Sequence, residues 1–134
     1  MLTGCERQME ESMYQLFVED HFDAAHYLPD YQGKCERMHG HRFKVVIRVH
    51  SATVGADGMA YDFAEMKRHL RDALLALDHC CLNELEAFAV SAPSSENIAA
   101  WLYETLRPRF EQSPVALSAV EVWESPTAGV VYTP

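Results

Sequence analysis

The chain has 134 residues, of which 49% are hydrophobic, and a formal net charge of -9 at pH 7. This length suits one domain with an ordinary core, and no run of about 18 apolar residues predicts a transmembrane helix. A strongly acidic chain without a Lys/Arg cluster also lacks the surface that binds nucleic acid. We therefore expect a soluble, cytoplasmic protein that binds neither nucleic acid nor membranes.

Residues 1–13 are polar and acidic and show no clear hydrophobic period, so we interpret them as a flexible N-terminal extension rather than a signal peptide. The folded domain is then expected to span residues 14–134. The cysteines do not make a disulfide framework, because Cys80 and Cys81 are adjacent and Cys5 falls in the extension. Reduced thiols are the better interpretation.

Two strands are predicted in the first half of the domain. Apolar and polar residues alternate from Tyr14, and this first strand ends at His26. Pro29 and Gly33 then indicate a loop. In the second strand, apolar residues share the parity of His39 and His41; these are Phe43, Val45, Ile47 and Val49.

Two helices and two further strands follow. Asp62, with Glu65 three residues later, predicts an N-cap and capping box, and the helix it begins has apolar residues spaced by 4, 4 and 3: Met66, Leu70, Leu74 and Leu77. Ser94 or Ser95 is expected to cap a second helix that Pro108 ends. Strands are then predicted over 116–124 and about 129–133. The order β-β-α-α-β-β predicts an α+β domain with two helices on one face of an antiparallel sheet.

Three histidines are the best candidates for a metal site. His39 and His41 lie two apart, so they share one face of an extended strand, and His26 closes the neighbouring strand. Any one of them alone is more typical of a surface or satisfied core residue. Together they match the three-nitrogen set of a catalytic zinc site, in which a fourth position stays open.

Cys35 allows two interpretations. Lys34 and Arg37 flank it, and their charges would favour a reactive thiolate that acts as base or nucleophile beside the metal. Alternatively, Cys35 is the fourth ligand of a closed structural zinc site.

Three further groups carry weaker signals. Asp78 and His79 could be a carboxylate that orients an imidazole, but neighbours in regular structure point apart, and a histidine at a helix C-terminus is the alternative. Glu124 ends a strand, where it is solvated or accepts two parallel hydrogen bonds from a planar amidine-like group. The segment 94–96, Ser94-Ser95-Glu96, is a helix start whose N–H groups could also hold a ligand.

Taken in order, six motifs resemble the 6-pyruvoyl-tetrahydropterin synthase family, and within it the bacterial branch that forms 6-carboxy-5,6,7,8-tetrahydropterin in the queuosine pathway. They are FDAAHYLP, CERMHGH, YDFAEMK, LDHCCLN, PSSEN and VWESPTAG. The resemblance implies the tunnelling fold (T-fold), with subunits assembled as a homohexamer of two trimers and active sites at subunit interfaces. The three residues between Cys35 and His39 are the spacing of the carboxy-forming branch.

The same resemblance implies roles for individual residues. It places Zn2+ on His26, His39 and His41, makes Cys35 the proton acceptor, and makes Glu124 the anchor of the pterin ring. His79 would relay protons to Cys35, oriented by Asp78, and Ser94, Ser95 and Glu96 would help to bind the substrate.

The implied reaction converts 7,8-dihydroneopterin triphosphate to 6-carboxy-5,6,7,8-tetrahydropterin, acetaldehyde and triphosphate, which makes the chain a carbon-carbon lyase. A 6-pyruvoyl- or sepiapterin-forming activity is the alternative within the class. An alternative of another class is a non-catalytic, zinc-stabilised subunit with Cys35 as the fourth ligand.

Overall fold

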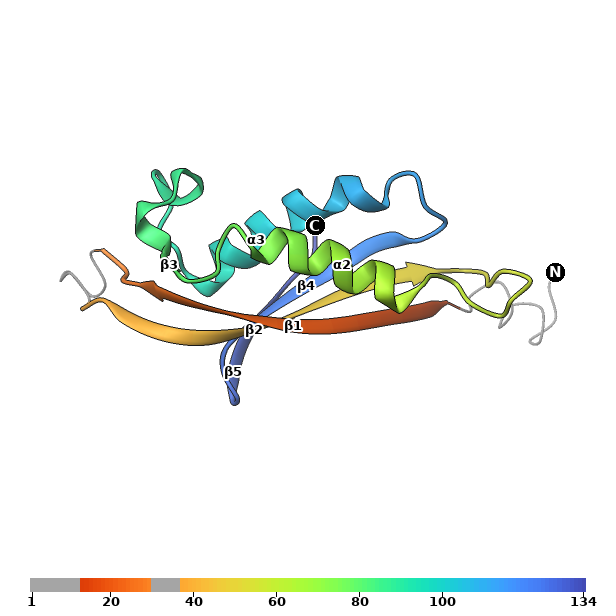
Figure 1. The fold of residues 1–134 in the computed structure, drawn as a ribbon, viewed down its shortest axis with the longest axis horizontal. Coiled ribbons are helices and arrows are strands. Elements are labelled where there is room, and N and C mark those ends of the chain that lie inside the picture. The colour runs from red at the N-terminus through yellow and green to blue at the C-terminus, as the bar shows by residue number, and fades with distance from the viewer. Residues whose placement is uncertain (1–12, 30–36) are drawn as a thin grey trace, which may run out of the picture.

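The computed structural model describes residues 13–29 and 37–134, and shows a single sheet with two α-helices on one of its faces (Figure 1). The strands are β1 (Tyr14–His26), β2 (His39–Ser51), β3 (Cys80–Cys81), β4 (Ala116–Ser125) and β5 (Ala128–Tyr132). The α-helices are α2 (Phe63–Leu74) and α3 (Ser95–Leu106), and short 3-10 helices are η1 (Leu82–Glu84), η2 (Glu86–Phe88) and η3 (Arg107–Phe110). The predicted α+β class is confirmed. Of these helices, none is long and apolar enough to cross a membrane.

The strand order in the sheet is β3-β1-β2-β4-β5. Strands β1 and β2 form a long antiparallel pair in which His26 lies opposite His39 and Ala24 lies opposite His41. Strands β2 and β4, and β4 and β5, are also antiparallel. The sequence did not predict β3, which pairs parallel to β1 through Ala24 and Cys80. This two-residue strand brings the segment after α2 back to the edge of β1.

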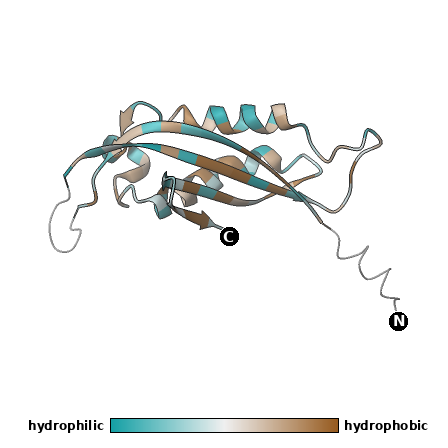
Figure 2. Ribbon diagram, turned by 90° about the horizontal axis from the view of Figure 1, so that it is seen from below, coloured by the Kyte–Doolittle hydropathy of each residue, from teal (hydrophilic) through white to brown (hydrophobic). Residues whose placement is uncertain are grey.

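Hydrophobic and hydrophilic residues alternate along the long strands (Figure 2), and the buried cluster joins residues of the strands to residues of both α-helices. On the sheet, Phe22 and Phe43 are fully buried and stack with ring centroids 4.8 Å apart. Both helices bury one stripe against this face, made of Met66, Leu70, Ala73 and Leu74 from α2 and of Ile98, Ala99, Leu102, Tyr103 and Leu106 from α3. Burying apolar area on one face of each element is what holds the two layers together.

Both helices begin at the predicted caps. The Asp62 carboxylate accepts a hydrogen bond from the Ala64 backbone N–H at 2.9 Å, and the Ser94 hydroxyl accepts one from the Asn97 N–H at 3.1 Å. Glu65, expected to complete a capping box, directs its carboxylate to Arg68 and His69. Helix α3 ends at Leu106, just before the predicted break at Pro108.

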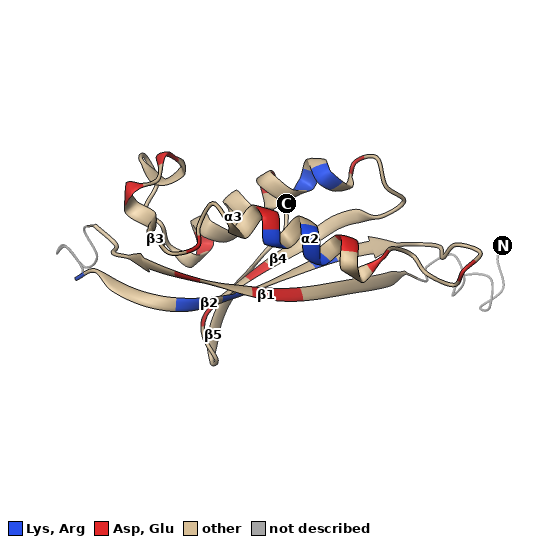
Figure 3. Cartoon of the chain, viewed as in Figure 1, with Lys and Arg blue, Asp and Glu red and all other residues tan. Residues whose placement is uncertain are grey.

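Charged residues of both signs are interspersed along the described strands (Figure 3). Arg48 on β2 donates to Glu121 on β4 at 2.6 Å, and the Trp123 indole N–H donates to the same carboxylate at 3.0 Å. Lys44 lies over the Trp123 ring, 4.4 Å from its centroid. This network ties β2 to the end of β4, immediately before Glu124.

Candidate metal centre

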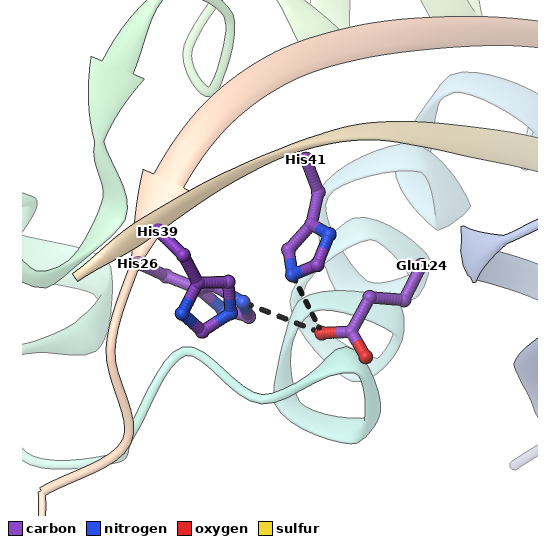
Figure 4. Close-up of side chains that lie close together, drawn as sticks. All are labelled: His26, His39, His41 and Glu124. Atoms are coloured by element: carbon purple, nitrogen blue, oxygen red, sulfur yellow. Dashed lines mark ion pairs between the residues drawn. The ribbon is translucent and has the colours of Figure 1, made fainter. Parts of the chain in front are cut away.

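Three imidazole rings meet at one end of the β1–β2 pair, on the face that the helices cover (Figure 4). His26 and His39 are opposite each other across the strands, and the period of two places His41 beside them. The ring centroids are 4.7 Å apart for His26 and His39, 4.5 Å for His39 and His41, and 5.2 Å for His26 and His41. The predicted grouping of the three histidines is therefore confirmed.

Backbone carbonyl groups fix which nitrogen of two rings is available to a ligand. Since a carbonyl only accepts, His26 Nδ1 carries the proton and donates to Pro93 O at 2.8 Å, and His39 Nδ1 donates likewise to Arg37 O at 2.9 Å. The Nε2 atom of each ring is then the nitrogen that faces the cluster. Orientation of a ligating histidine by a carbonyl on its other nitrogen is typical of metal sites.

A carboxylate completes the cluster. Oε1 of Glu124, at the end of β4, lies 3.3 Å from His26 Nε2 and 3.5 Å from His41 Nε2. Ligand atoms of His26, His39, His41 and Glu124 all lie within 4.8 Å of one another. The sequence pointed to Glu124 as a ring anchor and gave no signal for a carboxylate in contact with the histidines.

The geometry fits a bound cation. His26 is only 1% exposed, and its Nε2 makes no hydrogen bond within the described residues, although it faces an oxygen that is also an acceptor. Two lone pairs in contact repel each other unless a cation or a proton lies between them. A four-coordinate ion with bonds of about 2.0–2.2 Å separates its ligands by about 3.3–3.6 Å, which matches the two nitrogen-oxygen distances. The cluster can therefore hold a metal ion.

The start of α3 and the β4–β5 turn form a small cavity beside the cluster. Its volume is about 160 Å³, and Ser95, Glu96 and Glu124 line it together with residues 128–130. Ser94 is half-buried and serves as the cap of α3. The structure thus brings Ser95 and Glu96 to Glu124, as expected for residues that would bind one ligand.

Asp78 and His79 are in contact, which corrects the expectation that neighbouring residues point apart. His79 adopts a left-handed backbone conformation with φ 59°, so its Nδ1 turns back to 3.0 Å from Asp78 Oδ1. The backbone of Asp23 holds the pair, since its N–H donates to Asp78 at 2.9 Å and its carbonyl accepts from the His79 N–H at 2.6 Å. The Asp23 N–H holds the pKa of Asp78 below its usual range, and the His79 ring contributes. Asp78 is thus an anionic partner for a solvent-exposed imidazole.

The cysteines separate into two groups. Cys35 lies outside the described residues, so its predicted role as a base stays a prediction. Cys80 donates to Leu77 O at 3.1 Å, and burial, together with the neighbouring Cys81, raises the pKa of its thiol. A raised pKa leaves Cys80 a poor nucleophile.

Comparisons with known proteins identify the family. Residues 15–134 match the family described as 6-pyruvoyl tetrahydropterin synthase. The chain belongs to this family. It is 40% identical over 126 residues to "6-carboxy-5,6,7,8-tetrahydropterin synthase" of Synechocystis, covering 90% of this chain and 93% of that protein. It is 34% identical over 105 residues to human "6-pyruvoyl tetrahydrobiopterin synthase", covering 75% of this chain and 70% of the human protein.

A solved structure agrees with this assignment. The 6-pyruvoyl tetrahydropterin synthase of Caenorhabditis elegans superposes with a TM-score of 0.80 at 26% identity, covering 92% of this chain and 96% of that one. The fold is therefore the T-fold that the motifs implied, and the chain is a lyase of the pterin synthase family.

Proposed function

We propose that the protein is a zinc-dependent 6-carboxy-5,6,7,8-tetrahydropterin synthase of the queuosine pathway. It would convert 7,8-dihydroneopterin triphosphate to the carboxylated tetrahydropterin, acetaldehyde and triphosphate. The observation that carries the proposal is the meeting of His26, His39, His41 and Glu124 at one point of a chain from this family. The Synechocystis relative supports the choice of product through its name.

The histidines would hold Zn2+, because three imidazole nitrogens are the donor set of many catalytic zinc sites. Bound there, zinc would act as a Lewis acid that acidifies the hydroxyl groups of the substrate side chain. His26 is buried and oriented by Pro93, so it would bind the metal without rearrangement. The net reaction is an internal redox change and needs no further cofactor.

Other side chains of this protein would bind the ring and move protons. Glu124 would accept two parallel hydrogen bonds from the aminopyrimidinone edge of the pterin. Ser95 and Glu96 would contribute to the same pocket, and Ser94 would help to bind the substrate from the cap of the same helix. Cys35 would take a proton from the substrate side chain, and His79, oriented by the anionic Asp78, would relay protons to it. We further propose a cytoplasmic homohexamer, a dimer of trimers of the single domain 14–134, with the sites at subunit interfaces.

The test is incubation of zinc-loaded protein with 7,8-dihydroneopterin triphosphate. We expect 6-carboxytetrahydropterin and acetaldehyde in equal amounts, and the absence of both would refute the proposal. His26→Ala should lose zinc and turnover together. His21→Ala, at an exposed position of the same strand, is the matched control that should keep both.

One comparison favours a second activity, because the human relative is named for the 6-pyruvoyl product. The same incubation separates the activities, since a 6-pyruvoyl or sepiapterin product would appear without acetaldehyde. The spacing between Cys35 and His39 favours the carboxy product.

A non-catalytic zinc-stabilised subunit requires Cys35 as the fourth ligand. Alkylation of the zinc-loaded protein distinguishes this alternative from the lyase. We expect Cys35 to be modified while zinc is retained, and Cys35→Ala to abolish turnover and keep the metal. Protection of Cys35 by zinc, or loss of zinc from the Ala variant, would instead favour the closed site.

A further inference from the structure

We propose that Glu124 alternates between two partners. In the substrate-free protein its Oε1 atom is the fourth ligand of the metal, and the pterin ring draws the carboxylate away and so opens that position. The inference rests on the proposed function for the identities of the metal and the ring. It adds that ring recognition itself controls access to the metal.

The first partner follows from the distances in the cluster. A single oxygen, Oε1, is 3.3 Å from His26 Nε2 and 3.5 Å from His41 Nε2, and the other carboxylate oxygen points away (Figure 4). A carboxylate that only anchored a distant ring would have no reason to direct one oxygen at two imidazole nitrogens. With the metal bound, this placement makes Oε1 a monodentate ligand that fills the position a substrate hydroxyl needs.

The pterin ring, as the second partner of Glu124, competes with the metal for the same carboxylate. The aminopyrimidinone edge of a pterin offers two parallel N–H donors, which take both oxygens of a carboxylate in one plane. In this proposal, turning both oxygens into the plane of the ring moves Oε1 out of its place between His26 and His41. Binding of the ring therefore removes Oε1 from the metal.

The backbone around Glu124 is suited to this movement. The pairing of β4 with β5 shifts register between Trp123 and Ser125, so Glu124 is the extra residue of a β-bulge. Bulges re-aim a side chain and leave it outside the regular ladder. The Glu124 side chain is also 40% exposed, whereas that of His26 is 2% exposed, so the carboxylate is the movable member of the cluster.

Open space on both sides of Glu124 gives the carboxylate somewhere to go. One hollow, of about 160 Å³, contains Ser95 and Glu96. A second, of about 470 Å³, is lined by Arg42, Lys44 and Trp123 together with residues 124–126. A pterin ring that entered the first hollow would meet Glu124, which lines this hollow, before it reached the histidines, which do not. Small hydroxyl compounds without the ring would find the metal closed.

Replacing zinc with cobalt(II) tests whether Glu124 is a ligand of the metal, because the visible absorption of cobalt(II) reports the ligand set directly. We expect the spectra of Glu124→Gln and Glu124→Ala to differ from the wild-type spectrum, and the metal affinity of the Ala variant to fall at least about tenfold. Glu96→Gln removes a neighbouring carboxylate from the same cavity and should leave the spectrum unchanged. A Glu124→Gln spectrum that coincides with that of the wild type would overturn the proposal.

Titration with pterin itself, which has no side chain at C6, tests whether the ring draws the Glu124 carboxylate away from the metal. We expect the wild-type cobalt spectrum to move toward that of Glu124→Ala as the ring binds, and the Ala spectrum to stay unchanged. Binding of pterin, followed by fluorescence, without any change in the wild-type spectrum would overturn the switch. A spectral change in a protein that fails to turn over dihydroneopterin triphosphate would overturn the proposed reaction and leave this inference standing.

Discussion

The ion pair between Arg48 and Glu121 should contribute measurably to stability, and Arg48→Met tests this. The Glu121 carboxylate is 9% exposed and accepts from the Arg48 guanidinium at 2.6 Å. The substitution keeps an apolar stem of similar length. Within the described residues, it leaves the Trp123 indole N–H, at 3.0 Å, as the one remaining donor to the buried carboxylate.

The magnitude follows from burial. Removing one partner of a fully buried pair costs about 3–5 kcal/mol, and leaving a buried acceptor unsatisfied costs about 1–3 kcal/mol. Because the Arg48 side chain is 33% exposed, water reaches part of this site. We therefore expect Arg48→Met to lower the free energy of unfolding by about 2 kcal/mol at pH 7.

The loss should also depend on pH. Burial raises the pKa of Glu121, but the hydrogen bonds from Arg48 and Trp123 outweigh it and hold this pKa below its usual 4.5. A group whose folded-state pKa is lowered stabilises the protein above its unfolded-state pKa, and that contribution is lost as the pH falls through the folded-state pKa. The difference between wild type and Arg48→Met should therefore be largest at neutral pH and shrink below pH 4.5.

Urea denaturation at pH 7 and at pH values down to about 3.5, at one fixed protein concentration, measures both effects. Arg107→Met is the matched control, because Arg107 and Glu111 form an ion pair with both side chains about half exposed. An exposed pair of this kind contributes about 0–1 kcal/mol. Equal losses for the two Met variants, or a loss at Arg48 that does not change with pH, would refute the reasoning.

Three further predictions concern single histidines and the metal. Burial lowers the pKa of His69 from its usual 6.5 despite the nearby Glu65. The free energy of unfolding should therefore be highest above pH 6.5 and fall as the pH drops below it, because the folded state resists protonation of this ring. Urea titrations from pH 7 to 5 should show a smaller dependence of the unfolding free energy on pH for His69→Gln than for the wild type. His79→Asn should keep the stability, because Asn tolerates a positive φ, yet lose most turnover in the product assay, and an active, stable variant would contradict the relay role. Chelation should lower the thermal midpoint and added zinc should restore it, because zinc at 100 times its Kd raises the free energy of unfolding by about 2.7 kcal/mol. The thermal midpoint of His26→Ala should not respond to zinc.

The strands and the histidine cluster could be predicted because both depend on a period of two. Alternation along β1 fixes which residues face the core, and His26 shares the parity of Phe22, while His39 and His41 share that of Phe43. Once β1 and β2 pair as neighbours, the register places the three rings together. The helix starts were equally accessible, since a capping side chain lies next to the backbone groups that it satisfies.

The Asp78–His79 pair and strand β3 could not be predicted in the same way. Both depend on the left-handed conformation of His79, which is uncommon for residues other than glycine and has no sequence signature. The hydrogen bonds that stabilise this conformation come from Asp23, which lies 55 residues earlier than Asp78 and on another element. A tertiary contact of this kind decides a local conformation that local patterns leave undetermined.

The position of Glu124 against the histidines depends on a bulge, and bulges also escape pattern reading because they break the period that reveals a strand. The same irregularity explains why the two halves of the metal centre differ. The histidines come from the longest paired strands of the sheet, with His26 held by the carbonyl of Pro93, so their positions are fixed before any ligand arrives. The carboxylate comes from an unpaired position at the end of β4, next to open space on both sides. A fixed set of nitrogens with one movable oxygen can stay closed without substrate and open with it, whereas four ligands on regular strands could only stay closed.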